Sequence, residues 1–204
     1  MENAVELVST MEEANPVVVV SAGWAAVEGL LVRGGEAGVV GADRMASIVA
    51  CAFARAELGT IGMKYAKQQK LELTSSQAAA EMERMIREGT TPKFTKARDV
   101  SGLRRMEEAV KAPADAIGRV REYLQDAFRR LYNQRNLAMH RGTERSPGLD
   151  PTVRTVPQLV GAGLDRVAIA IERGTSPLLL VARAEVELNM LGTDGARSLC
   201  TLID

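Results

Sequence analysis

Apolar residues recur along this chain at spacings of three and four, the pattern of helices that bury one face. Asn15-Pro16 is typical of a helix N-cap followed by proline at the first helical position. The apolar run after it predicts a helix over residues 16–33, ended by Gly34-Gly35. The four valines 17–20 could begin a strand, but the Ala, Trp, Glu and Leu residues that follow favour a helix.

The same spacing predicts the remaining elements, while alternation typical of strands is nearly absent. We expect further helices at about 42–67, from Ser75 or Ser76 to near Gly89, at 113–139, at 156–173 and at 176–191. The polar stretches 89–102 and 143–155 contain proline, glycine and charges, and we expect them to be exposed loops. The pattern therefore predicts an all-α fold, a bundle of five to seven helices forming a single domain over residues 1–204.

Composition narrows the class of protein. Apolar residues make up 46% of the chain and charged residues 25%, the balance of a soluble globular protein. The N-terminus is acidic and the Val17–Val20 run is too short to span a bilayer, so we expect a cytoplasmic protein without membrane contact. Cys51 and Cys200 lack metal-ligand spacing and the chain has one histidine, so neither a metal site nor another cofactor is expected.

The formal net charge is zero, so any nucleic-acid binding must rest on a local patch. Residues 129–145 offer one, because they hold a single acid, Glu144, against five arginines: Arg129, Arg130, Arg135, Arg141 and Arg145. The first 32 residues hold five glutamates and no basic residue. This asymmetry is either ordinary surface variation or an RNA-facing region at 129–145, with Arg129, Arg130, Arg141 and Arg145 as RNA-binding residues.

The candidate chemistry lies at the end of the predicted helix 113–139. The sole histidine, His140, follows Arg135 by five residues, and Asn136 lies four residues before it, on the same helical face. On an ideal helix Arg135 and His140 point about 140° apart. They can meet on one substrate only if the helix ends there, which Gly142 would permit, or if two chains each supply a copy.

These residue types suit RNA cleavage through the 2′-hydroxyl. Histidine transfers protons near neutral pH, and arginine offers a fixed fork of donors to phosphate oxygens. Asparagine can orient either group without adding charge. From the residues alone, His140 could instead be a cation that caps the C-terminal end of a helix.

The segment from Leu131 to Gly142, with Arg135, Asn136 and His140 in it, resembles the signature of HEPN domains. The similarity lies in an arginine that is followed directly by a polar residue, with four residues, Asn136 among them, between the arginine and a histidine. The segment Trp24–Leu31 is similar to an early helix of HEPN proteins from bacterial defence systems. We interpret Glu28 in that segment as a solvated residue rather than as a partner of the arginine.

The resemblance implies an all-α bundle that dimerises, with paired motifs forming a composite cleft. It implies a metal-independent endoribonuclease, with Arg135, Asn136 and His140 as catalytic residues, in a toxin or antiviral defence setting. RNA, a second copy of the chain, and an antitoxin or larger effector assembly would be its partners. Because some HEPN members have lost catalysis, the alternative is a helical module that binds RNA, a nucleotide or a protein. A purely structural dimerisation domain is a third possibility.

Overall fold

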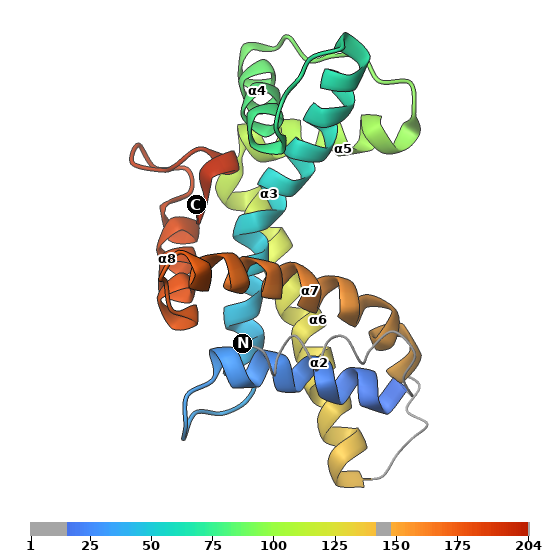
Figure 1. The fold of residues 1–204 in the computed structure, drawn as a ribbon, viewed down its shortest axis with the longest axis vertical. Helices are drawn as coiled ribbons and strands as arrows, with labels where there is room; N and C mark the ends of the chain where they lie inside the picture. Colours follow the sequence, from blue (N-terminus) through green and yellow to red (C-terminus); the bar gives the residue numbers. More distant parts are fainter. Residues whose placement is uncertain (1–15, 142–147, 204) are drawn as a thin grey trace. The chain divides into compact units, whose positions relative to one another are not determined.

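The fold is taken from a computed structural model that describes residues 16–141 and 148–203 (Figure 1). Every regular element in these residues is helical, so the prediction of an all-α chain is confirmed for the described part. The elements are α2 (Pro16–Leu31), α3 (Val40–Gln69), α4 (Ser75–Glu88), α5 (Ala97–Lys111), α6 (Pro113–Arg141), α7 (Leu149–Glu172), α8 (Pro177–Met190) and a 3-10 turn, η1 (Leu199–Thr201).

Local hydrogen bonds set the ends of these helices. The valines 17–20 are helical, and α2 ends near the predicted glycines because the Arg33 N–H donates to the carboxylate of Glu36 (2.8 Å). At the start of α4 the cap is Thr74, one residue before the predicted serine. Its hydroxyl accepts from the Gln77 N–H, while its own N–H donates to the Gln77 side chain, a complete capping box.

The prediction of a loop over residues 89–102 is wrong in its second half, because α5 begins at Ala97. The first turns of α5 are polar, but Leu103, Met106 and Ala109 recur at three-residue spacing and are buried. That apolar face forms the helix in spite of the loop-like composition before it.

The prediction of a loop over residues 143–155 is also wrong in part. Residues 142–147 lie outside the described part of the chain, but α7 begins at Leu149. Pro151 falls in the first turn of this helix, where a backbone N–H has no partner within the helix and proline is tolerated.

The residues group by their contacts into two compact units. Unit 1 is Met1–Val49 with Arg121–Ala182, and unit 2 is Ala50–Val120 with Arg183–Asp204. Helices α3, α6 and α8 contribute residues to both. The single domain over 1–204 stays a prediction.

Unit 1 contains the candidate site, and its core lies between α2, α7 and the adjoining parts of α3 and α6. Helix α2 packs against α7 (Figure 1). Gly163 lets α7 approach α3, since a Cβ there would lie 2.1 Å from the sulfur of Met45. The largest fully buried side chains of this unit are Trp24, Phe128, Leu31, Met45, Ile48 and Leu131. They hold the C-terminal part of α6 against the other helices.

Unit 2 contains α4, α5 and η1 with the adjoining parts of α3, α6 and α8. Helices α3 and α4 touch through their backbones, because a Cβ on Gly62 would lie 2.2 Å from the carbonyl oxygen of Ala78.

One helix of the described chain, α3, is long and apolar enough to cross a membrane by length and composition. Its most apolar window has a mean hydropathy of 1.3 and is 72% buried, as in the core helix of a folded protein.

Candidate active site

Arg135 lies on α6 with its guanidinium held by two side chains. Its Nη2 atom donates to Oε2 of Glu28, from α2, at 2.9 Å, and its Nη1 atom donates to Oδ1 of Asn136 at 3.0 Å. The Arg135 side chain is 27% exposed and that of Glu28 is 35% exposed. The guanidinium is therefore fixed in orientation but still open to solvent on one side. The interpretation of Glu28 as a solvated residue is wrong: it is the ion-pair partner of the arginine.

The contact with Arg135 also fixes the Asn136 carboxamide. A guanidinium carries only donors, so the oxygen of the carboxamide must face it. No hydrogen bond of the Nδ2 group is found among the described residues, and the Asn136 side chain is half-buried. Asn136 therefore makes the contact expected of a residue that orients the arginine.

An aromatic contact brings α2 and α6 together at this point. The rings of Trp24 and Tyr132 lie with centroids 4.9 Å apart and planes tilted by 54°. Because Glu28 follows Trp24 by four residues and Arg135 follows Tyr132 by three, the ion pair forms one helical turn beyond the two rings. The contact between the rings thus brings α2 and α6 close enough for Glu28 and Arg135 to pair.

Gly38, between α2 and α3, lies close to the side chains of Glu28 and Tyr132. A Cβ at this position would lie 3.1 Å from Oε1 of Glu28 and 3.1 Å from Cε2 of Tyr132. Those separations are tighter than ordinary van der Waals contact, so the absence of a side chain at Gly38 leaves room for both neighbours.

Nε1 of Trp24 and Oε1 of Gln134 are buried and have no hydrogen-bond partner among the described residues. Trp24 is fully buried. An unsatisfied buried polar atom costs about 1–3 kcal/mol, so native proteins carry few of them. Each of these two side chains therefore keeps one buried polar atom without a partner in the described part of the chain.

His140 lies in the last turn of α6, and its side chain is outside the described part of the structure. The helix continues to Arg141, so the backbone at His140 is still helical. The offset of about 140° from Arg135 therefore applies, with a rise of about 7.5 Å along the axis. The convergence of Arg135 and His140 on one substrate stays a prediction.

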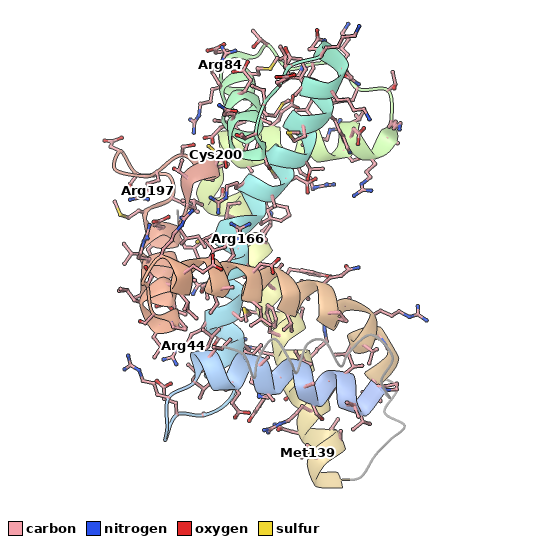
Figure 2. The ribbon with its side chains drawn as sticks, viewed as in Figure 1. Arg44, Arg84, Met139, Arg166, Arg197 and Cys200 are labelled. Carbon is pink, nitrogen blue, oxygen red and sulfur yellow. The ribbon has the colours of Figure 1, made fainter. Side chains whose placement is uncertain are left out.

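The last turns of α6 also present an apolar side chain to solvent. Met139 follows Arg135 by four residues, so the two share a helical face, and Met139 is 62% exposed (Figure 2). The face that carries the arginine thus holds one exposed apolar side chain toward the end of α6.

The predicted arginine patch is only partly described. Arg129 donates from Nη2 to Oδ1 of Asp43, on α3, at 2.8 Å, which reduces the free positive charge at that position. Arg130 is exposed, and no ion pair of its side chain is found within the described residues. The side chains of Arg141 and Arg145 lie outside the described residues.

Sequence reasoning missed the role of Glu28 and that of Gly38. Glu28 and Arg135 are 107 positions apart, so no local pattern pairs them. The available signal was the matched spacing of an aromatic and a charge on each helix, Trp24 with Glu28 and Tyr132 with Arg135.

In the described part of the chain, no three His, Cys, Asp or Glu side chains gather closely enough to hold a metal ion. Comparisons with protein-family models, with curated proteins and with solved structures find no match to this chain.

Proposed function

We propose that the chain is a metal-independent endoribonuclease of the HEPN type that cleaves RNA by attack of its own 2′-hydroxyl. The observation that carries the proposal is the Arg135 guanidinium, held by Glu28 and Asn136, half open to solvent, five residues before the only histidine of the chain. An oriented, permanently charged guanidinium and an imidazole that can transfer a proton are residue types suited to phosphodiester cleavage.

In the proposed reaction the 2′-oxygen attacks the adjacent phosphorus and the 5′-oxygen of the next nucleotide leaves. A base accepts the 2′-proton and an acid protonates the leaving oxygen, so the products are a 2′,3′-cyclic phosphate and a 5′-hydroxyl. His140 supplies proton transfer, and Arg135 stabilises the charge that develops on the phosphate oxygens. Asn136 keeps Arg135 in place and offers its Nδ2 donors to the same phosphate.

A symmetric homodimer is part of the proposal, with the two copies of Arg135 and His140 facing one another across a shared groove. Helix α6 runs through His140, and positions 135 and 140 of an ideal helix lie about 140° apart around its axis. A second copy would place its own His140 opposite this Arg135, and two histidines would supply both a base and an acid. The exposed Met139 beside the arginine gives such an interface an apolar contact.

The alternative is a non-catalytic module of the same architecture that binds RNA, a nucleotide or a protein. The observation that favours it is the engagement of Arg135 by Glu28, because an arginine fixed by an ion pair can serve structure alone. For the catalytic proposal, a toxin or antiviral role in the cytoplasm follows, controlled by an antitoxin or a larger effector assembly.

The test is RNA cleavage in EDTA by the wild-type chain and by variants of the site. General acid–base catalysis contributes about 10²–10⁴-fold, so His140→Ala should lose activity on that order. Arg135→Ala should fall comparably, while Asn136→Ala should be milder because Asn136 carries neither proton nor charge. Arg154→Ala, an exposed arginine of α7, is the control and should leave the rate unchanged. Cleavage by His140→Ala at the wild-type rate would refute the proposed role of His140, and no cleavage by the wild-type chain would assign it to the binding-module alternative.

A further inference from the structure

The segment from Lys93 to Arg105 carries five basic residues against one acid. It spans the irregular stretch before α5 and the first half of that helix. All of it belongs to unit 2, whereas Arg135 belongs to unit 1. The site described above therefore does not account for this concentration of charge.

Two ion pairs join α5 to α3, and they neutralise the carboxylates of Asp99 and Glu57. Asp99, the one acid of the segment, is 7% exposed and pairs with Lys64. Arg105 pairs with Glu57. Between these pairs Gly102 packs against α3, since a Cβ there would lie 3.3 Å from Cδ1 of Ile61. Helix α5 is thus joined to α3 at two points, and the only negative charge of the segment from Lys93 to Arg105 is paired within the protein.

Four basic side chains remain on the outside. Lys93, Lys96, Arg98 and Arg104 are exposed, and none forms an ion pair within the described residues. We call these four the 93–104 basic surface. On α5, Arg98 and Arg104 lie about 60° to either side of Ser101, opposite the buried apolar face. The acids Glu107 and Glu108 come only after this part of the helix.

An aromatic ring lies among these cations. Phe94, between Lys93 and Lys96 in the sequence, is half-buried, so part of the residue stays accessible to solvent. Cations that follow a backbone, beside an aromatic ring on which a base can stack, are the usual composition of surfaces for single-stranded nucleic acid.

We propose that the 93–104 basic surface binds the phosphate backbone of single-stranded RNA. The inference rests on the proposed function, because it gives that enzyme a contact with its substrate outside the Arg135 site. An anionic membrane would also attract four cations, but a helix that binds a bilayer presents its apolar face to it. The apolar face of α5 is buried against the protein, with Leu103 and Met106 in the core.

The test measures binding of the full chain to a fluorescent 2′-O-methyl oligouridine, which cannot be cut through its 2′-oxygen, as a function of salt. The variant Lys93→Gln/Lys96→Gln/Arg98→Gln/Arg104→Gln removes the surface. The matched control, Lys67→Gln/Lys70→Gln/Lys111→Gln/Arg119→Gln, removes four other exposed cations of unit 2. Circular dichroism checks that both remain helical.

For a single strand the slope of log affinity against log salt is about −0.7 per phosphate contact, so losing four contacts should flatten it by about 2.8. At about 0.1 M salt this corresponds to a loss of affinity of about 600-fold. The control should change the slope by less than about 0.7, one contact.

Equal effects of the two variants, or an unchanged slope in the first, would overturn the proposal. So would binding of the wild type to phosphatidylserine vesicles that the first variant loses while it keeps RNA affinity. The two proposals fail separately. A chain that binds the oligouridine through this surface but cuts no RNA refutes the nuclease alone. A chain whose first variant keeps full affinity, while the wild type cuts RNA, refutes only this surface.

Discussion

Glu83 is the buried carboxylate that attaches the C-terminal segment to α4, and removing it should destabilise the protein measurably. Its side chain is 4% exposed. Oε1 accepts from Arg87 at 2.6 Å and from the Leu199 N–H at 3.3 Å. Oε2 accepts from the Ser198 hydroxyl at 2.5 Å and from the Cys200 N–H at 3.1 Å. Figure 2 labels Cys200 in the turn held by these bonds.

The magnitude follows from these four donors. Each hydrogen bond to a charged group contributes about 1.5–3 kcal/mol. Replacing Glu83 also removes the free-energy cost of burying its charge, and this offsets part of the stability lost with the hydrogen bonds. Arg87 is 55% exposed and is solvated when the carboxylate is gone. We therefore expect Glu83→Ala to lower the free energy of unfolding by about 3 kcal/mol. Glu83→Gln should lose about 2 kcal/mol, because its amide nitrogen must face donors that need an acceptor.

The effect should also depend on pH. Burial opposes ionisation of Glu83, but hydrogen bonds from Ser198, Arg87 and Cys200 outweigh it and hold the pKa below its ordinary value of 4.5. A group whose pKa is lowered by folding stabilises the protein above its unfolded pKa and loses that contribution as pH falls through its folded pKa. The difference in the free energy of unfolding between wild type and Glu83→Gln should therefore be largest at about pH 7 and become smaller in acid.

Urea unfolding followed by far-UV circular dichroism, at several pH values, measures this gap. Glu81→Gln is the control on the same helix, since Glu81 pairs with Arg84 at the surface. This substitution should lower the free energy of unfolding by less than about 1 kcal/mol at every pH measured. If Glu83→Gln unfolds at the same urea concentration as wild type, or if its gap does not change with pH, the attachment through Glu83 is refuted.

Two further substitutions test the site and the packing. Glu28→Gln should slow RNA cleavage by about tenfold, less than Arg135→Ala, because a neutral amide holds the guanidinium more weakly. Glu36→Gln, which removes the carboxylate paired with Arg44, should leave the cleavage rate unchanged, and equal rates in the two variants would show that Glu28 does not position Arg135. Gly62→Ala should lower the free energy of unfolding by about 3 kcal/mol, because its methyl group would meet the backbone of Ala78. Gly118→Ala, with open space around it in α6, should stabilise by about 0.5–1 kcal/mol, and urea unfolding that ranks these two the other way would contradict the packing of α3 on α4.

The sequence predicts those helices of the described chain whose ends carry strong local signals. Pro16 begins α2 as expected, and Pro113 begins α6. Helix α5 was missed because its N-cap is Lys96 and its first turn holds Arg98 and Asp99, and what stabilises it is tertiary. The buried Asp99 pairs with Lys64, which lies 35 positions away on another helix. The composition and spacing of residues 89–102 alone therefore do not predict the contact between Asp99 and Lys64.

The candidate site divides in the same way. Arg135, Asn136 and His140 can be found from sequence because their spacing on one helix is local. The ion pair with Glu28 depends on how α2 packs on α6, which the contact of Trp24 with Tyr132 sets. Pairing across helices is decided by the whole core, so a periodicity that places each residue on a face does not identify its partner.

The most direct test of the central proposal compares two substrates of identical sequence in EDTA, one of RNA and one carrying 2′-O-methyl groups throughout. The proposal predicts that the wild-type chain cuts only the RNA, that the products end in 2′,3′-cyclic phosphate, and that His140→Ala is slower by about 10²–10⁴-fold. Cleavage of the 2′-O-methyl substrate, products with 3′-hydroxyl ends, or no cleavage of either substrate would contradict it.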